Sequence, residues 1–311
     1  MFKSRKRSFI CLISIVLIFM FVNISVYAYW TDPTNWKWVY LNGRWVDYEV
    51  QKGVAGTIES HAGAHYYTQS PHTTRYNSAM GVADIKNTWI DYGVYSNRVA
   101  YISLGTLSQM TETTGEAVDF GIRNDGNGWH VYYYTHGNYD VDFYTGRDED
   151  HPDLPPAQYF PHDELDHVYM NVSARIEVDY DDYGNPEYKD VLDGYFVFVK
   201  KDGEQVPVSV TIRRPKGTLF ASSWNNKPLL RFVRFMSLVP KDGLDRLDWS
   251  FLQATMKSLQ LYDSVDHCYK VWDFNSDLVQ NCWTVQNNNI KNFYSNWTID
   301  HINIKHEVNY W

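Results

Sequence analysis

The sequence lacks the short motifs that mark common nucleotide-binding and hydrolase sites. It contains no Gly-x-Ser-x-Gly nucleophile elbow, no P-loop and no dinucleotide-binding fingerprint. It also has no internal repeat and no Pro/Ser-rich linker, and strand and helix patterns do not alternate along it. These absences argue against an α/β fold and favour a single domain.

Basic residues are scarce as well. Lys and Arg number 28 against 37 Asp and Glu, which gives a net charge of −9 at pH 7. A nucleic acid or an anionic membrane surface requires a concentrated positive field on the protein that binds it. We therefore expect neither as a partner, whereas neutral or cationic ligands fit the charge.

A long apolar run occurs at the N-terminus, where Phe9 to Val22 follow four basic residues and precede the small residue Ala28. This is the layout of a secretory signal peptide. The run is shorter than the about 20 residues of a spanning helix, and an uncleaved anchor is the alternative. We expect residues 1–28 to be removed, which lowers the net charge from −9 to −13. Residues 29–311 would then be secreted to the extracellular space without membrane insertion.

Cysteine is also rare, with three in the chain. Cys11 lies within the expected signal peptide, so Cys268 and Cys282 remain after cleavage. An even number of cysteines in an oxidising compartment favours a disulfide, and we expect these two to pair. The pair would leave no thiol for nucleophilic catalysis.

Strand-forming residues are abundant, and aromatic residues make up 17% of the chain. Short aromatic and β-branched runs are separated by turn signals such as Asp202-Gly203. We therefore expect an all-β fold, an antiparallel β-sandwich or jelly roll, as a single domain over residues 29–311.

The turn signal Asn42-Gly43 lies between two such runs near the start of the expected mature chain. This dipeptide suits a type I′ turn, because both central residues of that turn need a positive φ. It predicts a hairpin over residues 36–50 in which Val39 lies opposite Val46.

Two segments depart from the strand pattern. Residues 145–167 carry four prolines and many charges, which exclude a regular element and predict a surface loop. Further along, apolar residues near helical spacing predict a short helix or turn from Leu247 to Leu252. A strand from Thr255 to Tyr262 should follow it.

The segment WHVYYYTH, residues 129–136, is unusually aromatic for one strand. In the preceding strand, residues 116–124, the large apolar residues are all even-numbered and must face the core. A connection of two or four residues between the strands pairs even-numbered residues with odd-numbered ones. The core set of the aromatic strand is then Trp129, Val131 and Tyr133.

The other parity of the aromatic strand forms a candidate ligand-binding face. Tyr rings offer an apolar surface to the C–H side of a sugar, and carboxylates accept hydrogen bonds from its hydroxyls. With a two-residue turn at Asp125-Gly126, Gly121 would lie opposite His130 and leave a dip beside the rings. The alternatives are that these side chains only stabilise the sheet, or that the 145–167 loop covers them. The candidate binding residues are Asp119, His130, Tyr132, Tyr134 and His136.

A second candidate site is a run of carboxylates. Glu177, Asp179 and Asp181 recur at every second residue and would project from one face of a strand. The segment resembles the Glu-x-Asp-x-Glu strand of jelly-roll β-glucanases, which implies Glu177 and Asp179 as candidate catalytic carboxylates. It departs from that pattern at Asp181, which is one methylene shorter than the Glu expected as acid/base. The alternative is an acidic strand end that leads into a turn.

The sequence carries no specific metal or cofactor motif. Residues 179–190 imitate a calcium loop through Asp179, Asp181 and Asp190, but Tyr183 replaces a ligand and the flanks are strand-like. The histidines of the proline-rich loop lack the spacing of a zinc site. We expect no cofactor, with calcium as the alternative.

The chain carries stretches such as VDFGIRNDGNGWHVYY and LLRFVRFMSLVP within an exported domain of many hairpin-linked strands. In this architecture it resembles the concanavalin A-like lectin and glucanase superfamily, whose members bind or cleave glycans. The resemblance implies a non-enzymatic protein of the cell envelope or exterior that binds a polysaccharide or glycan. A glycoside hydrolase or polysaccharide lyase, and a structural surface protein without a small ligand, are the alternatives.

Overall fold

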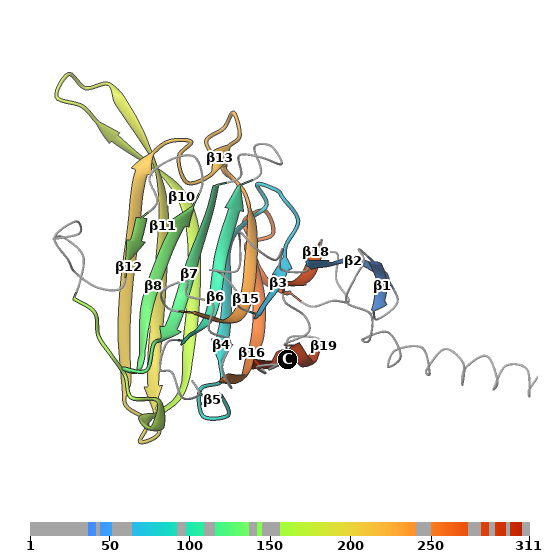
Figure 1. Ribbon diagram of the computed structural model, residues 1–311. Helices are drawn as coiled ribbons and strands as arrows, with labels where there is room; N and C mark the ends of the chain where they lie inside the picture. Colours follow the sequence, from blue (N-terminus) through green and yellow to red (C-terminus); the bar gives the residue numbers. More distant parts are fainter. Residues whose placement is uncertain are drawn as a thin grey trace, which may run out of the picture.

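The computed structural model describes a chain whose defined residues lie almost wholly in strands and turns (Figure 1). The backbone is described for residues 37–41, 44–51, 64–91, 98–108, 116–136, 142–144, 156–240, 250–272, 281–285, 290–296 and 299–306. Side chains are described for residues 69–91, 99–107, 118–135, 156–238 and 252–272. The expected signal peptide, residues 1–28, lies outside these ranges.

Two nine-stranded sheets build the fold. Strand β18 pairs with β2 in parallel, and the other described pairs of the first sheet are antiparallel. The first sheet consists, in order across it, of β1 (Lys37–Leu41), β2 (Arg44–Gln51), β18 (Asn281–Val285), β3 (Ala64–Gln69), β15 (Arg231–Pro240), β6 (Arg98–Ser108), β7 (Glu116–Asn124), β8 (Trp129–His136) and β9 (Asp142–Tyr144).

The second sheet is antiparallel throughout its described pairs. Its main order is β12 (Gln205–Pro215), β11 (Pro186–Lys200), β10 (Leu165–Tyr180), β4 (Tyr76–Ala83), β16 (Ser250–Asp263), β20 (Ile299–His306) and β19 (Ile290–Asn296). Strands β5 (Trp89–Asp91) and β17 (Cys268–Val271) also pair with β16, β13 (Ala221–Ser222) pairs with β14 (Pro228–Leu229), and η2 (His162–Glu164) is a 3-10 helix.

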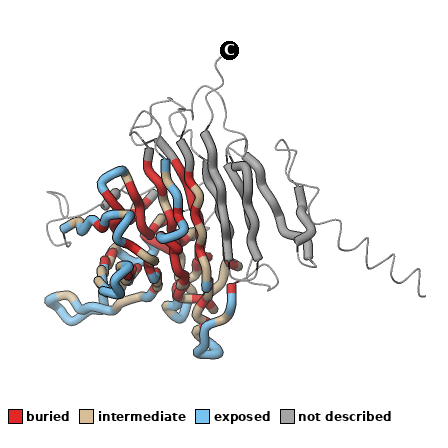
Figure 2. The backbone as a smooth tube through the Cα atoms, turned by 90° about the horizontal axis from the view of Figure 1, so that it is seen from below, coloured by how far each residue is buried: buried red, intermediate tan, exposed pale blue. Residues whose placement is uncertain are grey.

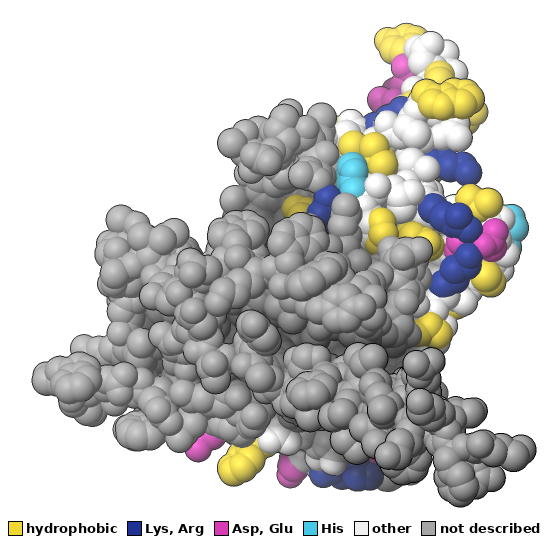
Figure 3. All heavy atoms as spheres, turned by 90° about the vertical axis from the view of Figure 1, so that its right-hand side faces the viewer, with side chains coloured by type: hydrophobic (Ala, Val, Ile, Leu, Met, Phe, Trp, Pro, Cys, Tyr) yellow, Lys and Arg dark blue, Asp and Glu magenta, His cyan; other side chains and the backbone are white. Residues whose placement is uncertain are grey.

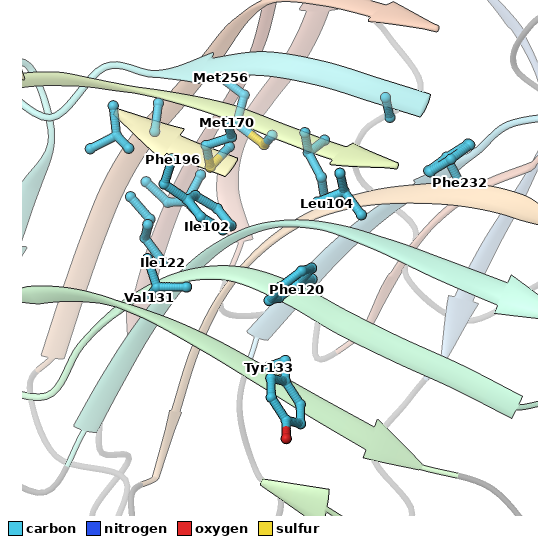
Figure 4. Close-up of a cluster of buried hydrophobic side chains, with 14 of the residues drawn as sticks. Ile102, Leu104, Phe120, Ile122, Val131, Tyr133, Met170, Phe196, Phe232 and Met256 are labelled. Carbon is cyan, nitrogen blue, oxygen red and sulfur yellow. The ribbon is translucent and has the colours of Figure 1, made fainter. Parts of the chain in front are cut away.

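The two sheets enclose one main hydrophobic core. Alternate side chains of both sheets point into it, so buried residues run along the strands while the turns are exposed (Figure 2). Phe120 of β7 meets Phe196 of β11 edge to face, with ring centroids 5.6 Å apart (Figure 4). Gly194 makes this contact possible, because a Cβ at that position would lie 2.2 Å from the Phe120 ring.

The predicted fold class is confirmed as an all-β, largely antiparallel arrangement of two sheets. The N-terminal hairpin is also confirmed, since β1 pairs with β2 and Val39 lies opposite Val46. The second turn signal joins β11 to β12, where Gly203 has a φ of +91° and its N–H donates to the Lys200 carbonyl at 2.9 Å.

Two local predictions need correction. Strand β16 begins at Ser250, so the expected helix does not include residues 250–252, which pair with β20 instead. Leu252 and Ala254 are buried at alternate positions, and this two-residue period prevails over the approximate helical spacing. The expected strand from Thr255 to Tyr262 is confirmed within β16, and residues 241–249 lie outside the described ranges.

The expected 145–167 loop is also shorter than predicted. Regular structure begins within it, with η2 at residues 162–164 and β10 from Leu165 onward. Leu165 is buried in the core, which explains why the strand starts there.

Candidate functional site

The aromatic strand β8 pairs with β7 through a four-residue connection. Asn124 lies opposite Trp129, which leaves residues 125–128 as the turn. Gly121 therefore lies opposite Tyr132. A two-residue turn at Asp125-Gly126 would have placed it opposite His130. The predicted parity is confirmed, because the odd-numbered apolar and aromatic residues of β8 lie in the main core.

Tyr132, at the centre of the predicted binding face, is buried and only 2% exposed. Its hydroxyl forms a 2.6 Å hydrogen bond with Ser103 Oγ, and its ring meets Tyr101 at 4.9 Å between centroids. Val233 and Phe235 of β15 join it in a second apolar cluster. Tyr132 thus stabilises the first sheet, as the alternative interpretation held, and offers a ligand no open ring surface.

His130 is also buried. Its ring packs 4.4 Å from the ring of Tyr159, and its Nδ1 lies 3.3 Å from the Gly128 carbonyl oxygen. Phe160, which follows Tyr159 in the chain, exchanges two 2.8 Å backbone hydrogen bonds with Trp129. The end of the proline-rich loop therefore covers the start of β8, which confirms that alternative at His130.

His162, from the same loop, acts as a structural acceptor. Its Nδ1 accepts a 2.9 Å hydrogen bond from the indole N–H of Trp129. Burial lowers the pKa of His162, and the charge of Lys201 acts in the same direction. The neutral imidazole that results keeps the lone pair that the buried indole requires.

The remaining members of the predicted face are less enclosed. Asp119 lies opposite Tyr134, and both side chains are half-buried. The side chain of His136 lies outside the described residues. The predicted face is therefore accessible only at Asp119 and Tyr134 among its described members, and its use as a binding site stays a prediction.

The candidate catalytic carboxylates are held by separate cations on the surface. Glu177 accepts hydrogen bonds from Arg175 at 3.1 Å and from Arg213 at 3.2 Å. Asp179 accepts a 3.0 Å hydrogen bond from Lys189, which lowers the pKa of Asp179. A general acid needs a raised pKa, so this geometry favours the acidic strand end over a catalytic pair.

The residues that imitate a calcium loop lie at a hairpin that projects from the body of the molecule (Figure 1), with hydrophobic and acidic side chains at its tip (Figure 3). Asp181 Oδ1 accepts hydrogen bonds from the backbone N–H of Tyr183 at 2.9 Å and of Asn185 at 2.7 Å. Asp190 lies farther along β11, where it is buried and accepts a hydrogen bond from the N–H of Gly217 at 2.8 Å. The carboxylates thus serve two different turns. Among the described residues, no group of three or more potential ligands could hold a metal ion.

The expected disulfide is not present. Cys268 is a free, exposed cysteine on β17 of the second sheet. Cys282 lies on β18 of the first sheet, and its side chain is outside the described residues. A disulfide needs the two Cα atoms within about 7 Å, and strands of different sheets rarely meet that closely at an exposed position.

An exposed aromatic face that we did not predict lies on the outer side of the second sheet. Tyr195 on β11 is 51% exposed, Tyr169 on β10 is 45% exposed and Tyr269 on β17 is 44% exposed. We call this surface the tyrosine face and define it by Ser78, Tyr169, Asn171, Tyr195, Tyr262 and Tyr269.

The register places these residues on one side of the sheet. Tyr195 lies opposite Asn171, Ser78 lies opposite Tyr262, and Tyr262 lies opposite Tyr269. Residues directly opposite one another share a face. On β10, β11, β4 and β16 the neighbouring residues along the strand point into the core, so the tyrosine face is the outer surface.

Hydrogen bonds fix the centre of the tyrosine face. Ser78 Oγ donates to Asn171 Oδ1 at 3.3 Å, and Asn171 Nδ2 donates to the Tyr269 hydroxyl at 3.4 Å. The Tyr269 ring also meets the Tyr262 ring edge to face at 5.2 Å. The central amide is therefore held in one orientation between aromatic rings.

Charged groups that border the tyrosine face are paired. Asp193 bonds with Arg175 at 3.1 Å and accepts from Thr211 at 2.8 Å. Lys257 forms a 3.0 Å ion pair with Asp84. Because these opposite charges offset one another, the surface suits a neutral ligand.

The signal for this face was present in the sequence. In β10, Tyr169 and Asn171 alternate with the buried residues Met170 and Val172, which is the two-residue period of a half-buried strand. The concentration of rings in β8 drew the prediction to the other sheet.

No protein-family model matches the chain, and no curated protein sequence matches it. Within the part of the chain that the structure describes, no helix is long and apolar enough to cross a membrane. The structure itself defines the class, which is an all-β protein of two packed sheets with an exposed tyrosine-rich face.

Proposed function

We propose that this protein is an exported, non-enzymatic carbohydrate-binding protein that holds a polysaccharide on the tyrosine face. The observation that carries the proposal is the set of exposed and half-exposed tyrosine rings around a fixed amide on one sheet surface. Rings cover the C–H side of a sugar, while the amide and hydroxyl groups bind its polar edge. Exposed aromatic patches of this kind mark binding sites.

Other features of the chain support the same proposal. The N-terminal segment favours export, and the negative net charge disfavours a nucleic acid as the partner. The packed antiparallel sheets agree with the resemblance to the concanavalin A-like superfamily, whose members bind or cleave glycans. The half-buried Asp119 and Tyr134 on the first sheet would be a lesser second contact.

A hydrolase is the weaker candidate. A retaining glycosidase requires two carboxyl groups about 5 Å apart that act on one bond. Glu177 and Asp179 are each neutralised by their own surface cations. No described contact brings them together, so the binding function is favoured.

The proposal is tested by retention of the purified protein on polysaccharides. Insoluble cellulose, chitin and xylan and soluble β-glucan and starch form the panel, and reducing-sugar release is measured in the same tubes. We expect retention on at least one neutral polysaccharide without release of sugar. Release would replace the binding function with hydrolysis, and absence of retention across the panel would favour a structural surface protein.

Substitutions locate the site. Tyr195→Ala and Tyr269→Ala should each weaken retention about tenfold, because each removes one ring that stacks on sugar. Tyr183→Ala is the matched control, since Tyr183 is 92% exposed at the projecting hairpin and outside the tyrosine face. Circular dichroism confirms that the variants fold. Unchanged retention in both face variants would exclude the tyrosine face as the site.

A further inference from the structure

The tyrosine face has an aromatic group at each end. Tyr195 and Tyr169 lie on the adjacent strands β11 and β10, while Tyr262 and Tyr269 lie on β16 and β17. Strands β10, β4 and β16 separate β11 from β17. Four strand spacings of about 4.8 Å make the backbone span about 19 Å. The face is thus longer than a single sugar ring.

The residues between the two aromatic groups are polar and less exposed than the rings. Ser78 is only 7% exposed, whereas the end residues Tyr195 and Tyr269 are 51% and 44% exposed. Asn171, on β10 opposite Tyr195, has intermediate exposure, and its amide donates to the Tyr269 hydroxyl. Asn171 therefore connects the two aromatic groups, since it lies opposite Tyr195 and donates to the Tyr269 hydroxyl.

We infer that the ligand is an extended, unbranched, neutral polysaccharide, and that the face binds an internal segment of it lying across the strands. This inference rests on the proposed function. A chain that crosses the face contacts both aromatic ends at once, and the second contact is intramolecular once the first has formed. A disaccharide reaches one end only.

The exposure of the rings at both ends explains why an internal segment is bound. Tyr195 and Tyr269 are each about half exposed, which leaves both rings open to a polysaccharide that extends past them. The paired charges Asp193 with Arg175 and Lys257 with Asp84 leave a neutral chain as the best match.

A length series tests this inference. Cello-, xylo-, malto- and chito-oligosaccharides from the dimer to the hexamer are titrated into the purified protein by calorimetry. We expect the hexamer of the recognised sugar to bind at least a hundredfold more tightly than the dimer. Reduction of its terminal sugar to the alditol should leave the hexamer affinity unchanged, because the chain end is not bound.

Variants separate the two ends. Tyr195→Ala and Tyr269→Ala should each lower hexamer affinity about tenfold and so narrow its advantage over the dimer, while the control Tyr183→Ala keeps the full length dependence. Equal affinity for dimer and hexamer, with polymer still retained, would overturn the extended-chain inference and leave the proposed function intact. Absence of binding to every polymer and oligomer would overturn both.

Discussion

Two buried carboxylates in this protein have pKa values shifted in opposite directions. Burial raises the pKa of an acid because the charged form loses its water. At Asp263, hydrogen bonds from Lys270 at 2.9 Å and Arg75 at 2.6 Å, with backbone N–H groups, outweigh burial and lower the pKa. At Asp190, backbone N–H groups are the partners, burial prevails and the pKa is raised. Residue type alone could not separate these two aspartates.

Asp263→Asn should lower the free energy of unfolding at pH 7 by about 2 kcal/mol, because it removes the buried one of the two carboxylates that Lys270 and Arg75 share. The folded pKa of Asp263 lies below its ordinary value of 3.8. The stabilisation is therefore present above that value and is lost as the pH falls through the folded pKa. Urea unfolding of the wild type and the variant at pH 7 and at about pH 3 measures this stabilisation.

Asp266→Asn is the matched control, since this exposed carboxylate binds the same two cations. This substitution should lower the free energy of unfolding by less than half as much as Asp263→Asn does, because water screens the exposed ion pairs. Equal losses in the two variants would show that burial of Asp263 does not strengthen its ion pairs.

Asp190 should respond in the opposite way. Because its folded pKa is raised, its stabilisation is present below 3.8 and is lost as the pH rises through the folded pKa. Asp190→Asn removes the charge and keeps an oxygen for the N–H of Gly217 and Leu219, so it should cost under about 1 kcal/mol at pH 7. Asp190→Ala, without an acceptor, should cost about 2 kcal/mol. Equal costs in urea unfolding would show that those hydrogen bonds contribute nothing.

At the scale of the strand, local alternation was sufficient to predict where side chains point. The odd-numbered apolar and aromatic residues of β8 enter the core as expected, since a strand presents every second residue to one face. The Asn42-Gly43 turn likewise set the register of β1 with β2. Both features depend on residues close together in the chain.

The side of β8 that faces away from the main core is covered by residues far from β8 in the chain. Tyr159 packs on His130, and Ser103 binds Tyr132, through contacts set by strand order and not by local pattern. The tyrosine face shows the same limit. The outward direction of Tyr169 follows from alternation, but its shared surface with Tyr269 exists only because of the order of β10, β4, β16 and β17.

The contact of η2 with β8 should depend on pH through His162. Its folded pKa lies below the ordinary 6.5, so its stabilisation is complete above that value and is lost as the pH falls from there through the folded pKa. His162→Gln keeps an acceptor for the Trp129 indole and does not titrate. The stability difference between wild type and variant should therefore shrink from pH 8 to pH 5 in urea unfolding followed by tryptophan fluorescence.

His162→Ala provides the comparison, because it leaves the buried indole N–H of Trp129 without an acceptor. It should cost about 1 kcal/mol at pH 8. A constant difference between wild type and the Gln variant from pH 8 to pH 5 would mean that His162 does not titrate in this range.

At the scale of the whole molecule, the core supports the outer surface. Phe196 and Tyr195 are consecutive on β11, so one ring points into the core and the other lies on the tyrosine face. The packing of Phe196 against Phe120 of the first sheet holds β11 in place. The position of the Tyr195 ring therefore depends on the contact between Phe196 and Phe120, which joins the two sheets.

Gly194→Ala tests this coupling, because the added Cβ would meet the Phe120 ring at 2.2 Å. Overpacking should cost about 2 kcal/mol of unfolding free energy and, by shifting β11, weaken polysaccharide retention at the neighbouring Tyr195. The double variant Gly194→Ala/Phe120→Leu should be more stable than the sum of the single losses predicts, since the smaller side chain admits the methyl group. Additive losses would mean that Gly194 does not accommodate Phe120. Recovery of stability without recovery of retention would show that the loss of retention does not arise from overpacking against Phe120.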